Sequence, residues 1–397
     1  MSDWVEKRLG EVCTLQRGFD LPTRQRKKGD YPLISSSGCI DSQAEAKVFG
    51  PGVVTGRSGS IGSVFFIEKD FWPLNTALYV KDFHGNDPRF IFHLLSKFDL
   101  KRFASGAGVP TLNRNNVHSE IVYVPSKVSE QKRIVSIVDQ AFEGIDGAIV
   151  NTKKNLANAH ELFESYLNAI FTQEGDSWVK KKLGKLASKI GSGATPRGGQ
   201  NSYQTEGISL IRSLNVHDRR FKEKDLAFLD DKQAEKLANV IVEEGDVLLN
   251  ITGASIARSC ISPTEHLPAR VNQHVAIIRP DPSQISYRFL NYLITSRPYK
   301  EKLLFTGDKA GATRQALTKA QIQDFSIHFP SLCEQGIIIT KLDLLEVETH
   351  RLEAIYRRKL AALTELKQSI LQKAFTGELT ADIANQTTKK AEEAIAA

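Results

Sequence analysis

The sequence predicts an α+β protein in which two mostly β domains are separated by two long helices that form an antiparallel coiled coil, arranged as a pseudo-twofold internal repeat. Two long segments, Ser129–Thr172 and Glu334–Thr376, have a helical period of apolar residues and no proline. They correspond at a constant offset of 204 residues, so Glu130 falls on Glu334. The segments before them also share short motifs in the same order, which indicates duplication of a larger unit.

Each long segment has an apolar seam with heptad spacing, as coiled coils require. The first seam comprises Val138, Ile145, Thr152, Ala159 and Tyr166, with Ala141, Ala148, Asn155 and Leu162 between them. The second comprises Leu342, Thr349, Tyr356, Leu363 and Ile370, with Leu345, Leu352, Lys359 and Leu366 between them. A single stripe of this kind is more often ordinary helix core than a spacer. Two equal copies, each about 60 Å long at roughly 1.5 Å per residue, favour paired spacer helices.

Five segments follow from this pattern. We predict a first globular domain over 1–128, a central long helix over 129–175, a second globular domain over 176–333, a C-terminal long helix over 334–379 and a flexible tail over 380–397. The tail is rich in Thr, Ala, Lys and Glu and has no apolar face to bury.

The globular segments contain short apolar runs separated by Gly, Ser, Asp and Pro, which is typical of β-rich domains. Helices are expected near Pro88–Phe98 and Tyr287–Ser296. Motif matching aligns Trp4–Val12 with Trp178–Leu186, and Val54–Gly62 with Leu249–Ala257. It also aligns Asn75 with Asn272. The offset varies between these motifs, so we expect a shared frame with loops of different length.

Charge and cysteine content narrow the class of protein. The net charge is +7, and the basic excess lies in the two globular segments, whereas the helical segments are slightly acidic. This division suits a protein that binds nucleic acid through two basic domains. Moderately basic chains are, however, common among soluble proteins of other kinds. Four cysteines lie far apart without metal-ligand spacing, which predicts free thiols and no metal site. No apolar run of eighteen residues occurs, so we expect a cytoplasmic protein without a membrane segment.

Catalytic signatures are absent from the sequence. No phosphate-binding Gly-x4-Gly-Lys-Ser/Thr motif occurs, nor an Asn/Asp-Pro-Pro-aromatic tetrapeptide typical of amino-methyltransferases. The nine histidines are scattered, and a lone histidine is more often structural than catalytic. We therefore predict no catalytic residues and no cofactor held by this chain.

Polar and cationic residues instead recur in the loops of both globular segments. Arg and Asn or Gln are the side chains that read base edges in a major groove, while Lys, Ser and Thr hold phosphates. The predicted DNA-binding residues of the first domain are Arg17, Arg24, Arg26, Lys27, Lys28, Ser36, Arg57, Ser58, Asn75 and Arg114. Those of the second are Thr195, Arg197, Arg212, Asn215, Asn250, Thr252, Arg258, Asn272, Gln273, Lys309 and Arg314. Any one of them alone is more often an ordinary solvated loop side chain, and it is the repetition of the set in both halves that favours DNA binding.

The order of these segments resembles the specificity subunit of type I restriction-modification systems. The motifs that carry the resemblance are Leu9-Gly10 and Leu183-Gly184, Ser58–Gly62, Thr111–Asn113, Val122–Pro125 with Glu130–Ile134, Ala169–Phe171, and Thr195-Pro196 with Leu210–Ser213. Two departures occur: Cys333–Gly336 lacks the basic pair of Lys132-Arg133, and Gln315–Thr318 lacks the asparagine of Thr111–Asn113.

The resemblance implies that each globular segment is a target recognition domain that reads one half of a bipartite, asymmetric DNA site. It implies that the chain itself is non-catalytic and that the helices set the spacing of the half-sites. Partners would be two modification subunits with S-adenosylmethionine, and restriction subunits with ATP and Mg. The predicted docking residues on the first helix are Glu143, Asp146, Glu161 and Glu164, whose other interpretation is a plain solvated face.

Two alternatives come from other classes of protein. The chain could be a nuclease or methyltransferase with a disguised site, which binding of S-adenosylmethionine or metal-dependent cleavage by the chain alone would reveal. It could also be a coiled-coil adaptor that binds protein or glycan, for which DNA-independent behaviour would be the sign.

Overall fold

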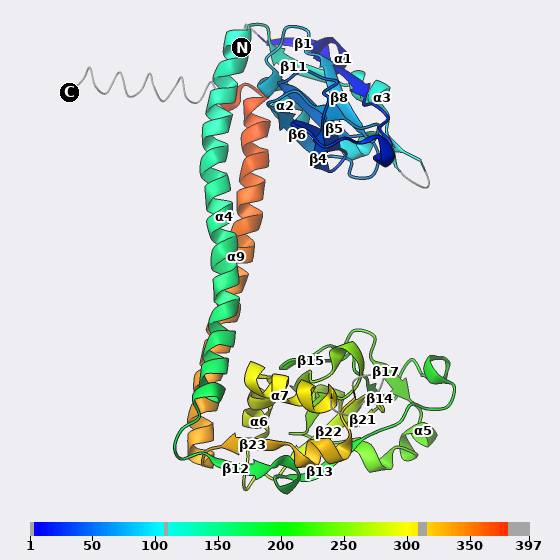
Figure 1. The fold of residues 1–397 in the computed structure, drawn as a ribbon, viewed down its shortest axis with the longest axis vertical. Helices are drawn as coiled ribbons and strands as arrows, with labels where there is room; N and C mark the ends of the chain where they lie inside the picture. The colour runs from blue at the N-terminus through cyan, green and yellow to red at the C-terminus, as the bar shows by residue number, and fades with distance from the viewer. Residues whose placement is uncertain (1–3, 107–109, 309–315, 380–397) are drawn as a thin grey trace, which may run out of the picture. The chain divides into compact units, whose positions relative to one another are not determined.

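The computed structural model describes residues 4–106, 110–308 and 316–379 (Figure 1). The predicted tail over 380–397 lies outside this range. The chain divides into two compact units, one formed by residues up to Lys153 together with those from Arg357, the other by Lys154–Tyr356. Each unit holds one β-rich domain and part of both long helices, whereas the sequence boundaries treat the helices as separate segments. None of the described helices combines the length and apolar character needed to cross a membrane.

The first domain is built on an antiparallel four-stranded sheet in the order β2-β8-β5-β6. Its strands are β2 (Thr14–Arg17), β8 (Ala77–Asp82), β5 (Gly52–Gly56) and β6 (Val64–Ile67). The other strands are β1 (Trp4–Arg8) paired with β11 (Ile121–Pro125), β4 (Gly38–Gln43), β3 (Tyr31–Ser35) and β7 (Trp72–Pro73) in a second sheet, and β9 (Ala104–Ser105) with β10 (Thr111–Leu112). The helices are α1 (Leu9–Val12), α2 (Pro88–Lys97) and α3 (Arg114–His118).

The second domain repeats this plan with the sheet β13-β22-β19-β20. These strands are β13 (Ala187–Ser192), β22 (Val275–Pro280), β19 (Val247–Asn250) and β20 (Ser259–Ile261). Further strands are β12 (Val179–Lys182) with β23 (Ser326–Phe329), β17 (Ala227–Leu229), β14 (Ile208–Ile211), β21 (Ala269–Val271) and β18 (Ile241–Val242) in a second sheet, and β15 (Val216–His217) with β16 (Arg220–Phe221). The helices are α5 (Asp231–Glu235), α6 (Tyr287–Thr295), α7 (Arg297–Asp308) and α8 (Lys319–Asp324). The helices predicted near Pro88 and Tyr287 are thus confirmed as α2 and α6.

A glycine marks the same point of both frames. Gly18 follows β2 and Gly193 follows β13, each at the place where the chain passes the last residues of the neighbouring strand β7 or β21. A Cβ on Gly18 would lie 2.3 Å from the carbonyl oxygen of Leu74, and one on Gly193 would lie 1.7 Å from that of Val271. Both distances are far below contact, so only glycine allows this close approach of two backbones.

The long helices are α4 (Val128–Gln173) and α9 (Leu332–Ala374). Within the first unit Lys367 of α9 pairs with Asp146 of α4, while Ile134 and Leu371 share one core. In the second unit His160 of α4 lies 3.6 Å from Glu353 of α9. In the first unit the contacts approach the start of α4 as they approach the end of α9, so the pairing is antiparallel, as predicted.

The predicted seam is correct over part of its length only. Val138, Ile145, Thr152 and Ala159 are buried, but Leu162 and Tyr166 are 51% and 39% exposed. Beyond Ala159 the buried positions are instead Phe163, Leu167 and Phe171. These residues join the core of the second domain, where Phe171 packs edge-on against Phe289 of α6 with centroids 5.5 Å apart. The spacing of four residues turns the buried face from the helix pair toward the domain.

Each domain is held to the start of a long helix by a buried glutamine. Gln131 accepts a hydrogen bond from the backbone N–H of Asp87 at 2.9 Å and donates to the carbonyl of Pro125 at 3.1 Å. Gln335 accepts from the N–H of Ser286 at 2.8 Å and donates to the carbonyl of Pro330 at 2.9 Å. The glutamine of the Glu-Gln pair that recurs in the sequence is therefore a clamp between domain and helix.

An aspartate about two turns further along each long helix also links that helix to its domain. Asp139 contacts Nε of Arg89 at 3.1 Å and Nε2 of His93 at 2.6 Å. Asp343 contacts Nη2 of Arg288 at 2.6 Å and accepts from the hydroxyl of Tyr292 at 2.8 Å. Both aspartates thus bind an arginine and a ring side chain four residues beyond it, so the two domains meet their helices in the same way.

Candidate nucleic-acid interface

Three loops gather at one end of the four-stranded sheet in the second domain. The register pairs Ser192 with Ala276 and Asn250 with Val275, so β13 and β19 end where β22 begins. The loops 193–198, 251–258 and 272–274 therefore share one edge of the sheet. We call it the reading edge of this domain. In the first domain Arg17 pairs with Leu78 and Gly56 with Ala77, and the same three connections define an equivalent reading edge.

A chain of hydrogen-bonded side chains crosses the reading edge of the second domain. The hydroxyl of Thr195 donates to Oε1 of Gln273. Nε2 of Gln273 lies 3.1 Å from Nε2 of His274, whose Nδ1 lies 2.6 Å from the hydroxyl of Thr252. Because the Gln273 amide nitrogen is a donor, His274 accepts at Nε2 and donates from Nδ1. Gln273 is exposed and the other three are partly exposed, so the chain of side chains lies at the surface.

The first domain has a shorter version of this arrangement. Nδ2 of Asn75 donates to Oδ1 of Asp20, and Asp20 accepts a hydrogen bond from Nη2 of Arg17 at 3.0 Å. Arg57 donates from Nη1 to the backbone carbonyl of Asn75 at 3.2 Å. Thr76, which follows Asn75, has a buried hydroxyl with no hydrogen-bond partner among the described residues. Two of these residues, Asp20 and Thr76, are new candidates that the sequence alone did not single out.

Backbone hydrogen bonds correct the sequence alignment of the two domains. The N–H of Leu74 donates to the carbonyl of Ile34 at 2.7 Å, and the N–H of Asn272 donates to that of Ile211 at 3.1 Å. Leu74 and Asn272 are therefore equivalent, so the counterpart of Asn75 is Gln273, one residue beyond the predicted Asn272. By the same register Ser58 corresponds to Thr252, because each forms a bridge to the segment that precedes α3 or α8, at Thr111 or Ala316.

Three predicted DNA-binding residues belong to the interior instead. Asn215 is fully buried and its amide donates to the carbonyl of Lys222 at 2.8 Å. Asn250 is also fully buried and donates to the carbonyl of Ser213 at 2.9 Å. Asn272 is 4% exposed, and its Oδ1 accepts from the N–H of His274 at 3.0 Å. We correct the prediction for these three: they satisfy backbone groups within the domain, as buried polar groups must.

The remaining predicted residues are surface groups, but they do not all lie at the reading edges. Ser36 follows the end of β3 beside Gly59 and so accompanies Arg57, Ser58 and Asn75. The basic run Arg24, Arg26, Lys27 and Lys28 precedes β3, and Lys27 N–H donates to Oε1 of Gln43 at the opposite end of that strand. Arg114 lies on α3, and Arg258 follows β19 and is partly exposed. Lys309 and Arg314 lie outside the described residues.

Arg197 borders a cleft beside the reading edge of the second domain. The cleft measures about 540 Å³ and is lined by Thr195, Arg197, Gln233 and Lys236 among others. Arg212 lies over the ring of Tyr203 at 5.2 Å. Elsewhere in this domain, burial and the charges of Lys222 and Arg258 lower the pKa of His217. Arg197 and Lys236 place positive charge at the cleft, which favours an anionic partner.

The predicted docking residues on α4 divide into two groups. Glu143, Asp146 and Glu161 are exposed, although Asp146 pairs with Lys367. Glu164 instead faces the second domain, where it accepts from Nη2 of Arg219 at 2.5 Å. Only 15% of the Arg219 side chain is exposed. We therefore correct the prediction for Glu164, which links helix and domain rather than offering a free surface.

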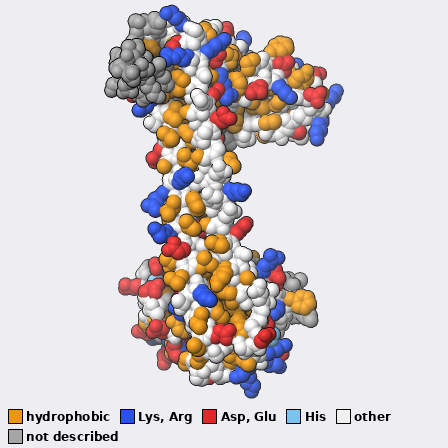
Figure 2. Space-filling view, turned by 90° about the vertical axis from the view of Figure 1, so that its left-hand side faces the viewer, with side chains coloured by type: hydrophobic (Ala, Val, Ile, Leu, Met, Phe, Trp, Pro, Cys, Tyr) orange, Lys and Arg blue, Asp and Glu red, His pale blue; other side chains and the backbone are white. Residues whose placement is uncertain are grey.

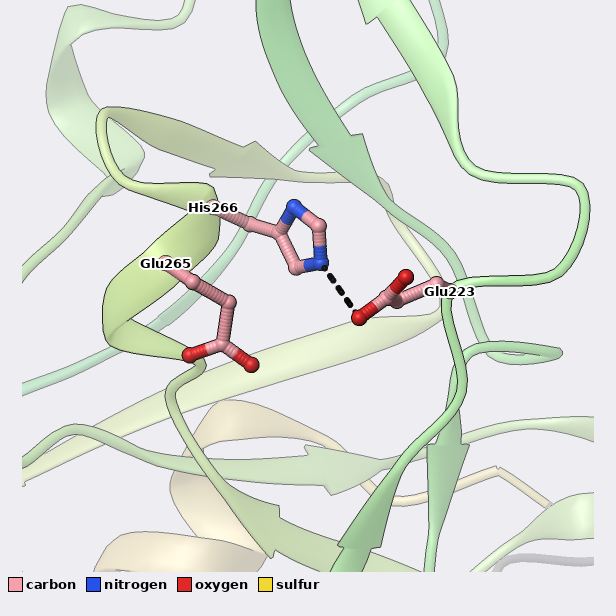
Figure 3. A group of neighbouring side chains, drawn as sticks. All are labelled: Glu223, Glu265 and His266. Atoms are coloured by element: carbon pink, nitrogen blue, oxygen red, sulfur yellow. Dashed lines mark ion pairs between the residues drawn. The ribbon is translucent and has the colours of Figure 1, made fainter.

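A small acidic group elsewhere in the second domain combines Glu223, Glu265 and His266 (Figure 3). Nε2 of His266 lies 3.3 Å from a carboxylate oxygen of Glu223. The Glu265 carboxylate has an oxygen within 4.8 Å of both and accepts from the hydroxyl of Thr264 at 3.3 Å. Both carboxylates are exposed, and an ordinary surface ion pair accounts for the arrangement.

Comparison with known proteins identifies the family. Residues 1–158 and 175–359 match the family described as type I restriction modification DNA specificity domain. The specificity subunit of the type I restriction enzyme EcoBI from Escherichia coli is 25% identical over 95% of this chain and 86% of its own length. That of StySPI from Salmonella potsdam is 25% identical over 74% of this chain and 66% of its own.

Solved structures have the same fold. A chain from a structure described as showing complex assembly and conformational transition of the type I R-M system has a TM-score of 0.73, with 19% identity over 95% of this chain and 99% of that one. The HsdS subunit from Thermoanaerobacter tengcongensis has a TM-score of 0.56, with 19% identity over 95% and 97%. The match over both globular segments decides the assignment: the chain belongs to the type I restriction-modification DNA specificity family.

Proposed function

We propose that this chain is the DNA sequence-recognition subunit of a type I restriction-modification complex. Each β-rich domain reads one half of a bipartite, asymmetric site through its reading edge, and the long helices fix the spacing between the half-sites. The observation that carries this proposal is the repeat of one frame with different side chains at equivalent positions, such as Thr76 and His274. A shared frame with altered readers gives two different sequences the same mode of docking.

The proposal assigns no chemistry to this chain. Modification subunits that bind S-adenosylmethionine would methylate adenine, and restriction subunits would use ATP and Mg. The two buried thiols fit this division, because burial raises the pKa of Cys13 and of Cys260 to about 12. Neither thiol is a nucleophile at neutral pH.

An exposed apolar stripe on α9 supports docking of the modification subunits on the helices. Ile337, Leu344 and Ile355 are separated by seven and eleven residues, so they lie on one side of the helix. They are 52%, 64% and 39% exposed, and Val347 beside them is 63% exposed. Figure 2 shows hydrophobic side chains along the exposed face of the helical segments. Uncovered apolar residues in a row are typical of a protein interface. We assign the main docking contact to this stripe rather than to the acidic residues of α4.

The experiment is to express the chain with its cognate modification subunits in a host without adenine methylation and to map methylated adenines across the genome. The expected result is one bipartite motif with a fixed spacer. Replacing residues 176–333 with the corresponding domain of a relative should change one half of the motif and leave the other. Methylation that is independent of this chain, or S-adenosylmethionine binding by this chain alone, would overturn the proposal.

A further inference from the structure

We infer that the side-chain amides of Asn75 and Gln273 each read one adenine, and that Asp20 in one domain, and Thr195 with His274 in the other, are positioning residues that hold those amides in the reading orientation. This inference rests on the proposed function and deepens it. It names the base that one position in each half-site requires and the residues that set this requirement.

The first step is the equivalence of the two amides. The register of the sheets places Asn75 and Gln273 at the same point of the frame, two residues before the first residue of β8 or β22. Their partners Asp20 and Thr195 are equivalent as well, since each lies two residues after Gly18 or Gly193. Each domain therefore has one amide at its reading edge, and each amide is bound by a side chain from the same loop.

The second step is the set of hydrogen-bonding groups that remain free. An amide oxygen accepts two hydrogen bonds and an amide nitrogen donates two. Thr195 occupies one acceptor position of Gln273, and His274 occupies one donor position. One acceptor and one donor remain, and Gln273 is exposed. This is the pair that adenine requires, because adenine presents an N6 donor beside the N7 acceptor in the major groove.

The third step concerns orientation. A free amide can rotate by half a turn and exchange its donor with its acceptor, which blurs its preference for one base. Thr195 donates to the oxygen and His274 accepts from the nitrogen, so the two partners together favour one orientation. Thr252 accepts from Nδ1 of His274 at 2.6 Å and thereby keeps the acceptor at Nε2. In the first domain the acceptor-only carboxylate of Asp20 selects the nitrogen of Asn75.

The two networks predict different sensitivities. The second domain holds its amide from both ends through Thr195 and His274, whereas Asp20 holds only the nitrogen of Asn75. Thr76, the counterpart of His274, makes no hydrogen bond among the described residues through its hydroxyl. Loss of one positioning partner should therefore relax the first half-site more than the second.

The test maps adenine methylation in cells that produce the complex with wild-type or variant chain. Gln273→Ala should abolish the preference for adenine at one position of one half-site, a loss of about 5- to 150-fold in discrimination. Asn75→Ala should do the same at one position of the other half-site. Gln323→Ala removes an exposed amide of the second domain that lies beside Gly184, at the other end of β13 from the reading edge, and should leave the motif unchanged.

The positioning role is tested by Thr195→Val, which removes the hydroxyl and keeps the shape of the side chain. It should relax the same position as Gln273→Ala and no other, by a smaller factor, with the total yield of methylation retained. Asp20→Leu should act in the same way on the Asn75 position. A structural role alone would weaken the whole half-site instead.

The outcomes separate the inference from the proposed function. If the wild-type complex has a bipartite motif, yet every position keeps its preference in the Gln273 and Asn75 variants, the inference is wrong and the proposed function stands. If the relaxed position does not specify adenine in the wild-type motif, the inference is also wrong. If the wild-type complex has no motif at all, the proposed function itself fails.

Discussion

Gln131 holds Asp87 through a hydrogen bond of 2.9 Å from the Asp87 N–H to the glutamine Oε1, in a site where only 1% of Gln131 is exposed. Its counterpart Gln335 is fully buried and holds Ser286 in the same way at 2.8 Å. The same side chain thus joins domain to helix in both units. A glutamine here caps the domain helix from outside, because the bound N–H belongs to the residue just before α2 or α6.

Replacing this glutamine should loosen the domain from its helix. Gln131→Ala leaves the Asp87 N–H and the Pro125 carbonyl without their partner, which costs about 1–3 kcal/mol for each buried group left unsatisfied. We expect the first unit to unfold at a lower concentration of denaturant. Hydrogen exchange of the backbone amides of α2 measures this unfolding. Gln140→Ala, at an exposed position of the same helix, should change the free energy of unfolding by less than about 0.5 kcal/mol. Equal effects of the two substitutions would contradict the clamp.

The link through His93 should make the first unit sensitive to acid. Burial lowers the pKa of His93, against the opposing effect of Asp139. Since the unfolded chain then binds a proton at higher pH than the folded unit, stability is constant above about pH 6.5 and falls as the pH drops below it. In the second unit Tyr292 takes this place, and burial raises its pKa, so it stays neutral.

This dependence is measured by hydrogen exchange of α2 and α6 between pH 7.5 and 5.5, with exchange rates corrected for pH. Protection of α2 should decrease more than protection of α6, and His93→Gln should remove most of the difference between the two helices. A decrease of the same size in both helices would show that other groups cause it.

The apolar stripe of α9 should be required for assembly. Leu344→Asp places a charge at a position that is 64% exposed in this chain, so the fold should tolerate it. Burial of that charge in a complex should weaken binding of the modification subunit at least tenfold. His350→Asp is the matched control, because His350 is exposed about 120° around the helix from Leu344. Binding is measured by calorimetry or by co-purification. Unchanged binding of the Leu344 variant would place the contact elsewhere.

The four cysteines should react in two classes. Cys39 and Cys333 are exposed, whereas Cys13 and Cys260 are buried with pKa values raised to about 12. A thiol reagent at pH 8 should therefore modify two cysteines in the folded chain and four after denaturation, as counted by mass spectrometry. Rapid modification of Cys13 or Cys260 in the folded chain would show that their domains open readily.

The sequence predicted the architecture well because helical period and repeat spacing are local signals. It identified both long helices, the helices α2 and α6, and the Glu-Gln motif at Gln131 and Gln335. It did not show that the buried face of α4 turns at Phe163, because that turn depends on contact with Phe289 of a distant segment. In the sequence the heptad pattern continues through Leu162 and Tyr166, although in the structure it is the neighbouring face of α4 that packs against the second domain.

Site residues were harder to predict than the fold. Asn215 and Asn250 are of a residue type that reads bases. Only the structure shows that both are buried and donate to backbone carbonyls. The pairing of Asn75 with Gln273 required the register of two sheets, since loops of different length shift the sequence alignment by one residue. The sequence alone did not single out His274, whose Nε2 lies 3.1 Å from the amide nitrogen of Gln273. The sequence signal that could have indicated His274 as a site residue is its position just before the strand β22.

The close approach at Gly18 and Gly193 bears on how such a protein could diversify. The loop after β2 and the loop after β13 each begin at this close contact of two backbones. A loop exchanged between the two domains would therefore be joined to the frame in the same way at its start. New specificities could then arise by recombination within one gene, without any redesign of the scaffold that carries them.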